Sequence, residues 1–191
     1  MTQSKRVVGI TGGSGCGKSY ISTLLRERGV PVIDCDVVAR EIMEPGTPCL
    51  CEAVDFFGTE ILSEGRLDRQ KLAQIVFSDE NMLKKLNEIT HKYILKDIYN
   101  KIEQEKSKLV CVDGAVLIES GIKCDKMIGI VADRGIRKSR IKERDGLSEE
   151  AAEKRINAQK PDSFYLENCD RVFYNNGHDT DFEAILKGII E

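Results

Sequence analysis

Two patterns of apolar and polar positions recur along much of the chain. Short apolar runs, typical of buried strands, occupy residues 6–11, 32–33, 108–113, 127–132 and 171–174. Apolar residues spaced three or four positions apart, typical of amphipathic helices, occupy residues 18–28, 36–43, 134–144, 148–158 and 181–190. Runs that follow one another in this order predict an α/β fold with a parallel sheet.

A long block in the first half of the chain interrupts this order. From about 48 to 106 no convincing strand pattern appears, and helical patterns cover 49–57, 69–77 and 81–105. We therefore expect one domain with a helical insertion, since 191 residues suffice to bury one sizeable core. The expected division is a core at 1–47, 107–133 and 161–191, an insertion at 48–106 and a further helical segment at 134–160.

The turn after the first apolar run carries the most specific motif in the chain. Residues 12–19 read Gly-Gly-Ser-Gly-Cys-Gly-Lys-Ser and match G-x-x-x-x-G-K-[ST], the phosphate-binding P-loop. The glycines let backbone N–H groups converge on a phosphate, while Lys18 adds an ammonium group and the Ser19 hydroxyl suits Mg²⁺. A glycine-rich turn without a ligand is the alternative. The strand, loop and helix patterns in sequence favour a nucleoside triphosphate site.

Three aspartates end two of the predicted strands. Asp34 and Asp36 follow the second strand, and Asp113 closes the third. Ligands of open α/β sheets bind at this edge, and a carboxylate beside an attacking hydroxyl can accept its proton. We expect Asp36 to have that role, with a helix N-cap as the alternative, and Asp34 to support the turn or a metal-bound water. Asp113 fits the Walker B pattern, in which a carboxylate helps to hold Mg²⁺.

The helix predicted over 134–144 is strongly basic. It contains six basic residues and one acid, and Arg137, Arg140 and Arg144 lie three or four apart on one face. Arginine binds phosphate oxygens bidentately, so this face indicates a triphosphate partner, although a solvated surface helix is the alternative. Helix, Gly146 turn and helix after the fourth strand predict a lid over the nucleotide. We therefore expect segment 134–160 to be that lid.

Composition narrows the function classes. The net charge of −3 and a pI near 5.6 argue against a nucleic-acid-binding protein. The chain has no apolar run of about 18 residues and no secretory leader pattern, so we expect a cytoplasmic protein without a membrane partner. The seven cysteines lack metal-ligand spacing and are interpreted as structural free thiols. Cys16 lies inside the P-loop, where its modification should block nucleotide binding. Of the two histidines, His178 is expected in a loop.

Taken together, these features resemble the dephospho-CoA kinase family over nearly the whole chain. The resemblance rests on 10–19, Val32-Ile33-Asp34-Cys35-Asp36, Ala39-Arg40, Gly58, Gly65-Arg66-Leu67-Asp68-Arg69, Leu72, Val76-Phe77, Ile89-Thr90-His91, Val112-Asp113, Leu117-Ile118-Glu119, Arg140, Arg144, Gln159 and Asn175-Asn176-Gly177. It departs from the family pattern at four places: Tyr20 after the P-loop serine, Lys92 after the histidine, Ala115 after Asp113-Gly114, and Tyr174-Asn175, where an aspartate is frequent.

The resemblance implies a P-loop nucleotide core, a helical CoA-binding insertion and a lid. ATP would phosphorylate the ribose 3′-hydroxyl of dephospho-CoA, with Mg²⁺ as cofactor. The implied catalytic residues are Asp36, Lys18 and Arg140, and the implied acceptor-binding residues are Asp36, Arg69 and His91. The metal would be held by Ser19 and Asp113. The expected nucleotide-binding residues are Gly12, Gly13, Ser14, Gly15, Cys16, Gly17, Lys18, Ser19, Tyr20, Arg140 and Arg144.

Other functions remain open at this point. A P-loop kinase of a nucleoside, nucleotide or small metabolite would share the donor motifs. A GTP-dependent switch is disfavoured because the chain lacks an Asn-Lys-x-Asp motif. For His91, a hydrogen-bonding surface residue on a helix is the alternative to an acceptor contact. We expect a monomer or a weak homo-oligomer, since no apolar stripe stands out beyond the needs of the core.

Overall fold

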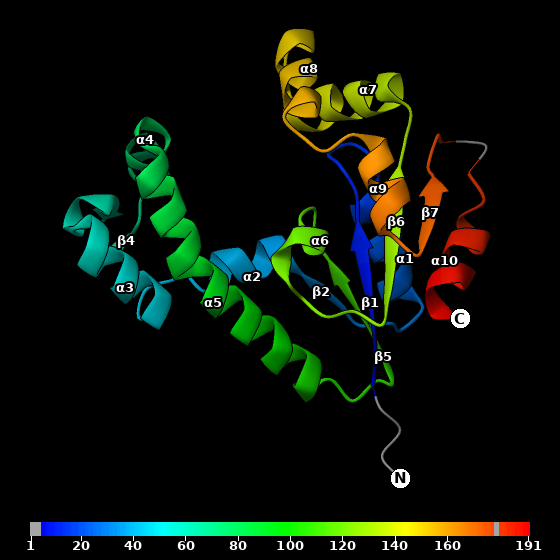
Figure 1. Cartoon of the computed structure of the whole chain (residues 1–191), viewed down its shortest axis with the longest axis horizontal. Coiled ribbons are helices and arrows are strands. Elements are labelled where there is room, and N and C mark those ends of the chain that lie inside the picture. The colour runs from blue at the N-terminus through cyan, green and yellow to red at the C-terminus, as the bar shows by residue number, and fades with distance from the viewer. Residues whose placement is uncertain (1–4, 178–179) are drawn as a thin grey trace. The chain divides into compact units, whose positions relative to one another are not determined.

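A computed structural model of the chain describes residues 5–177 and 180–191. His178, expected in a loop, lies outside these residues. Parallel pairing joins β5 to β1, β1 to β6 and β6 to β7, and β2 lies at the edge beside β5 (Figure 1). The α/β fold with a mainly parallel sheet is therefore confirmed. Within the described residues, the sheet contains five strands, in the order β2 (Val32–Asp34), β5 (Leu109–Asp113), β1 (Arg6–Thr11), β6 (Lys126–Val131) and β7 (Arg171–Tyr174).

The chain divides into two compact units. The first unit comprises Met1–Ile33 and Glu105–Glu191, and the second comprises Asp34–Gln104. The second unit therefore begins earlier than the insertion expected at 48–106. The reason is local packing, because α2 (Cys35–Glu41) packs against the long helix α5 (Glu80–Gln104). Each unit is described below by itself.

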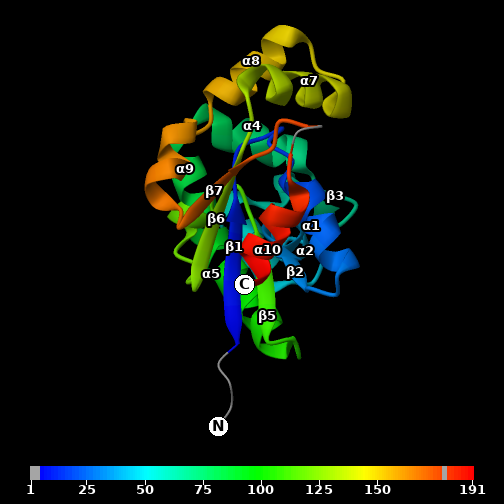
Figure 2. The ribbon, with the colours of Figure 1, turned by 90° about the vertical axis from the view of Figure 1, so that its right-hand side faces the viewer.

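A cluster of buried apolar side chains lies on one face of the sheet in the first unit. Side chains alternate along a strand, so Ile128 and Ile130 of β6 point to the same face, and both are fully buried. The helices α1 and α10 pack against each other on that face, while Tyr165 of α9 lies near Gly129 on the other (Figure 2). The helices of this unit are α1 (Lys18–Glu27), α6 (Leu117–Ser120), α7 (Arg134–Asp145), α8 (Glu149–Asn157), α9 (Asp162–Asn168) and α10 (Phe182–Ile190).

The helices α7 and α8 form a hairpin with a small core of its own. Ile141 of α7 packs with Ala152 and Ile156 of α8, and Leu147 of the turn covers them. Ser148 starts α8 by accepting a hydrogen bond from the N–H of Ala151. Sequence periodicity predicted both helices but missed α6 and α9, which are four and seven residues long. Such short helices span too few turns to show a 3.6-residue period.

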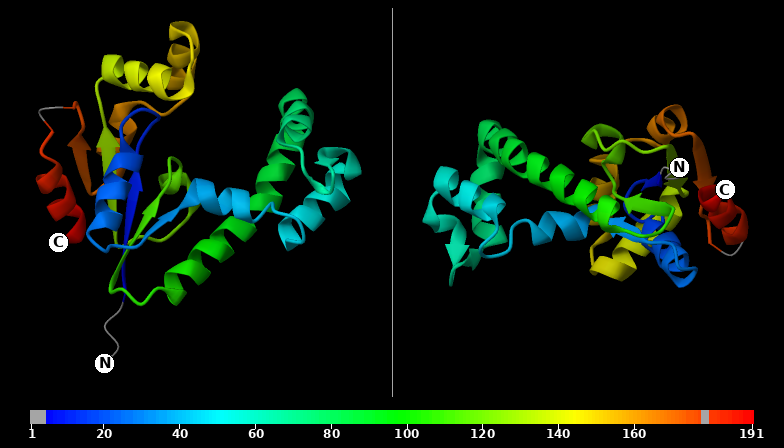
Figure 3. Two further views of the ribbon diagram at one scale, coloured as in Figure 1. Left: turned by 180° about the vertical axis from the view of Figure 1, so that it is seen from behind. Right: turned by 90° about the horizontal axis from the view of Figure 1, so that it is seen from below.

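The second unit is mainly helical, and α4 and α3 both pack against α5 (Figure 3). Its elements after α2 are α3 (Pro48–Phe57), a 3₁₀ turn (Thr59–Ile61), β3 (Leu62–Ser63), β4 (Arg66–Leu67), α4 (Arg69–Ser78) and α5. The expectation of no strand in this block is wrong, because β3 and β4 pair antiparallel. Their two-residue turn has positive φ at both Glu64 and Gly65, which suits a tight hairpin. Strands this short leave no alternating pattern in the sequence.

Whether a helix can span a membrane depends on its length and its apolar character. Spanning the hydrocarbon core takes about 20 predominantly apolar residues. No helix within 5–177 and 180–191 combines the length and the apolar character needed to cross a membrane.

Candidate functional site: a phosphate-binding loop and its arginines

The P-loop connects the buried end of β1 to α1. Gly17 precedes the helix with φ of 92°, a conformation that L side chains rarely adopt. An added Cβ would also lie 2.1 Å from Nδ2 of Asn175. Lys18 opens α1 and its Nζ donates to the carbonyl oxygen of Gly12 at 3.0 Å. The loop therefore curves so that the ammonium group of Lys18, near the end of the P-loop, lies beside Gly12 at its start.

Asn175, directly after β7, forms a hydrogen bond to the P-loop. It is 2% exposed, and its Nδ2 donates to the carbonyl oxygen of Cys16 at 2.9 Å. From the sequence, Asn175 was named only within the resemblance and as one departure from the family pattern, and it was given no role. Only the Asn-Asn-Gly sequence after a strand could have drawn attention to it. Its burial and loop contact make it part of the site.

Arg140 lies at the P-loop. Its Nη1 donates to the carbonyl oxygens of Gly15 at 3.2 Å and Asn175 at 3.0 Å. Arg144 lies one turn further along α7 and is bonded to Asp145 at 2.8 and 2.9 Å, with a side chain that is 58% exposed. The hydrogen bond from Arg144 lowers the pKa of the Asp145 carboxyl group. The structure therefore brings Arg140 to the loop, whereas Arg144 pairs within the tip of the hairpin.

Two hard oxygen donors are candidates for a divalent cation. Ser19 is exposed in the first turn of α1, and Asp113 is buried at the end of β5. The hydroxyl of Ser22, three residues after Ser19, donates to Oδ2 of Asp113 at 2.6 Å. Hydroxyl and carboxylate oxygens with phosphate oxygens are the ligands that Mg²⁺ prefers, so these residues fit it. Sequence reasoning missed Ser22, although its spacing from Ser19 puts both on one helix face.

A cavity of about 520 Å³ opens beside the loop. Tyr20 and Phe182 flank it in an edge-to-face contact, with ring centroids 5.0 Å apart. Tyr20 is half exposed although it is a large aromatic residue. Aromatic walls next to a phosphate loop suit a planar base. The remaining lining residues are Gly17, Arg140, Asn175, Gly177 and Thr180.

The second unit begins with Asp34 and Asp36, of which Asp36 is the carboxylate predicted to contact the acceptor. Oδ1 of Asp34 accepts the N–H groups of Asp36 at 2.8 Å and Val37 at 3.2 Å, which makes Asp34 the N-cap of α2. The alternative interpretation of Asp36 as the cap is therefore wrong. Asp36 is exposed in the first turn of α2. Its side chain is not needed to start the helix.

Arg69 and His91 are both exposed, on different helices of the second unit. Arg69 begins α4 directly after its N-cap Asp68, and His91 lies in α5, against which α4 packs.

Lys92, which departs from the family pattern, forms an ion pair within the second unit. It pairs with Oε1 of Glu52 at 2.6 Å, and the hydroxyl of Tyr93 donates to Oε2 at 2.7 Å. These two hydrogen bonds lower the pKa of Glu52.

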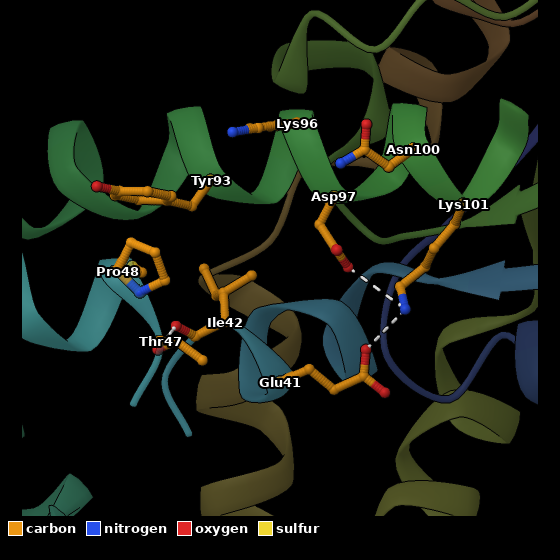
Figure 4. A pocket seen from close by; sticks show the side chains of 10 residues that line it. Glu41, Ile42, Thr47, Pro48, Tyr93, Lys96, Asp97, Asn100 and Lys101 are labelled. Atoms are coloured by element: carbon orange, nitrogen blue, oxygen red, sulfur yellow. Dashed lines mark hydrogen bonds and ion pairs between the residues drawn. The ribbon is translucent and has the colours of Figure 1, made fainter. Parts of the chain in front are cut away.

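The second unit also contains a cavity of about 500 Å³ (Figure 4). Tyr93, Asp97 and Asn100 of α5 line it, and Nζ of Lys101 lies 3.0 Å from Glu41 and 3.4 Å from Asp97. His91 precedes Tyr93 by two residues, so it faces roughly the opposite side of α5. The cavity therefore does not include the histidine expected to bind the acceptor.

All seven cysteines are free thiols. Cys16 is 1% exposed beneath the P-loop, and burial raises the pKa of its thiol. Cys51 is exposed on α3 in the second unit. Thiol chemistry should therefore differ between these two positions.

Known proteins resemble this chain over most of its length. Residues 6–181 match the model of the dephospho-CoA kinase family. Dephospho-CoA kinases from Corynebacterium glutamicum and Enterococcus faecalis are 39% and 38% identical to the chain, over 96% and 97% of it and over 97% and 96% of their own lengths. A Thermus thermophilus crystal structure shares 31% identity, with a TM-score of 0.86 over 98% of this chain and 97% of its own. The Campylobacter jejuni dephospho-CoA kinase structure shares 26% identity, with a TM-score of 0.70 over 97% and 96%. Shikimate kinases at 13% identity or below share the fold. The chain belongs to the dephospho-CoA kinase family.

Proposed function

We propose that this protein transfers the γ-phosphoryl group of ATP to the ribose 3′-hydroxyl of dephospho-CoA and so forms coenzyme A, the last step of its biosynthesis. The observation that carries the proposal is the P-loop of a dephospho-CoA kinase family member, with Lys18 and Arg140 both bonded to loop carbonyls. Family membership gives the reaction class, and the loop supplies the chemistry that the reaction requires.

The donor is bound by the first unit. Backbone N–H groups of the P-loop and of the start of α1 surround the phosphates, apart from the N–H of Ser14, which donates to Gln159. Lys18 exchanges its bond to Gly12 for the β- and γ-phosphates. Arg140 likewise exchanges carbonyl contacts for phosphate oxygens, which form stronger charge-assisted hydrogen bonds. The adenine base lies in the cavity that Tyr20 and Phe182 help to line. The hairpin of α7 and α8 closes as the lid and brings Arg144 toward the phosphates.

The cation is Mg²⁺, held by the hydroxyl of Ser19 and, directly or through water, by the carboxylate of Asp113. When bound, the ion offsets part of the negative charge on the β- and γ-phosphates. Ser22 keeps the Asp113 carboxylate oriented through its 2.6 Å hydrogen bond. Excluding water around these groups strengthens every one of these charge interactions.

The acceptor is bound by the second unit. Asp36 takes the proton of the 3′-hydroxyl as the oxygen forms its bond to the γ-phosphorus, while the bond between that phosphorus and the β-γ bridging oxygen breaks and ADP leaves. The exposed carboxylate of Asp36 is available because Asp34 caps the helix. Arg69 and His91 contact the acceptor.

The protein works in the cytoplasm, whose reducing conditions suit its seven free thiols.

An acceptor panel tests this function. The protein is incubated with ATP and Mg²⁺ and with dephospho-CoA, adenosine, AMP, pantetheine or shikimate, and ADP release is followed by a coupled assay. Of these acceptors, we expect only dephospho-CoA to be phosphorylated, and mass spectrometry should show a product heavier by one phosphoryl group. Turnover with another acceptor and none with dephospho-CoA would assign the protein to another small-molecule kinase activity.

A further inference from the structure

Gln159 makes contacts that the reaction described above does not use. Its Oε1 accepts the backbone N–H of Ser14 at 2.9 Å, and its Nε2 donates to the Ser14 hydroxyl at 2.8 Å. One amide side chain thus holds both the main chain and the side chain of a P-loop residue. The two residues are 145 positions apart in the sequence, so no local pattern predicts the pairing.

Arg137 also binds Ser14, at its backbone carbonyl group. Its Nε donates to the Ser14 carbonyl oxygen at 3.0 Å and its Nη2 to Oε1 of Gln159 at 2.9 Å. The guanidinium group is 5% exposed, and Nη1 lies 3.4 Å from Oδ1 of Asp162. The N–H, the hydroxyl and the carbonyl group of Ser14 are therefore all bound by side chains from outside the loop.

The two side chains come from the two ends of the helical hairpin. Arg137 lies in the first turn of α7, and Gln159 follows α8 by two residues. Both converge on the loop so closely that a Cβ on Gly13 would lie 2.3 Å from Nη2 of Arg137 and 2.9 Å from Oε1 of Gln159. Gly13 is therefore required for this contact with the hairpin base, in addition to any contact with phosphate.

We propose that Gln159 is a positioning residue for the donor: together with Arg137 it fixes Ser14 and so sets the shape of the P-loop and the base of the hairpin in one arrangement. Gln159 acts through Ser14 and does not itself react. A loop held in the binding shape loses less conformational freedom when the phosphates bind. The proposal rests on the donor half of the proposed function and is independent of which acceptor is used.

The test separates nucleotide affinity from stability. Gln159→Ala is compared with wild type and with Lys154→Ala, a control at an exposed position of α8. We expect the Kd for MgADP by calorimetry and the KM for ATP to rise about tenfold, since two hydrogen bonds are lost. The KM for dephospho-CoA should stay within about twofold, and the control should match wild type. Because ADP binding needs no acceptor, this readout stands even if the proposed reaction fails.

Ser14→Ala keeps the test decisive if Gln159→Ala does not fold. It deletes only the hydroxyl that accepts from Nε2, and we expect about a threefold rise in the Kd for MgADP, from one lost hydrogen bond. In a double-variant cycle the two changes should be less than additive, because they remove a shared interaction. An unchanged Kd in both variants, with a lowered Tm, would show a structural role alone and overturn the proposal. Equal rises in the KM for ATP and for the acceptor would overturn it as well.

Discussion

The two units of this protein hold their predicted functional residues in opposite ways. In the first unit, Lys18, Arg140 and Asp113 are each bonded to a neighbouring group of the site. In the second unit, Asp36 and Arg69 are exposed. The proposed donor site is thus held together by its own hydrogen bonds, whereas the proposed acceptor residues lie exposed on helices. Removing a group of the proposed donor site should therefore lower both nucleotide affinity and rate. Removing a group of the proposed acceptor site should lower the rate and leave nucleotide affinity unchanged.

Lys18→Ala should have the largest effect. In the proposed reaction the ammonium group contacts the phosphates both in the ground state and as charge develops, so both affinity and rate should depend on it. We expect kcat/KM for ATP to fall about a thousandfold or more, measured by ADP release. Lys187→Ala, at an exposed position of α10, is the matched control and should behave as wild type. Near-normal activity in the Lys18 variant would mean that the loop does not bind the donor as proposed.

Asp36→Asn tests the other side of the comparison. Without a general base we expect kcat to fall about a hundredfold, while the Kd for MgADP stays unchanged because Asp36 belongs to the acceptor unit. Asp34→Asn is the matched control, since asparagine also caps helices well and should leave kcat nearly intact. Equal losses in the two variants would indicate damage to α2 instead of loss of a base.

These two aspartates also show how far sequence reasoning reached. The strands around β1, the P-loop and α7 were predictable because apolar runs, glycines and helical spacing are local signals. For Asp36 the choice between a base and a helix N-cap was left open, and Asp34, which the structure shows to be the N-cap of α2, was not considered for that role. The contacts of Gln159 and Arg137 with Ser14 could not be predicted, for another reason. Their partner Ser14 is more than 120 positions away, and only the folded chain brings them together.

Ser22→Ala should have a smaller effect than either variant above. The hydroxyl orients Asp113 at 2.6 Å, and loss of such an outer partner weakens metal sites about tenfold. We expect the Mg²⁺ concentration for half-maximal activity to rise by about that factor, with kcat recovered at saturating Mg²⁺. Thr23→Ala is the matched control, because that exposed hydroxyl donates to the backbone carbonyl oxygen of Ser19 within α1 at 3.0 Å. An unchanged Mg²⁺ dependence would remove Ser22 and Asp113 from the proposed cation site.

The smallest effect is expected from thiol alkylation, which compares one cysteine in each unit. Burial raises the pKa of the Cys16 thiol, so at pH 8 less of it is thiolate than of an ordinary cysteine, and reagent must also reach beneath the loop. Iodoacetamide should therefore modify the exposed Cys51 first, with activity intact, as followed by peptide mass spectrometry and ADP release. Activity should fall only as Cys16 is slowly modified, because a larger side chain there displaces the loop. Equally fast labelling of both cysteines would mean that the P-loop opens readily, and the contrast between a pre-assembled donor site and a displayed acceptor site would no longer hold.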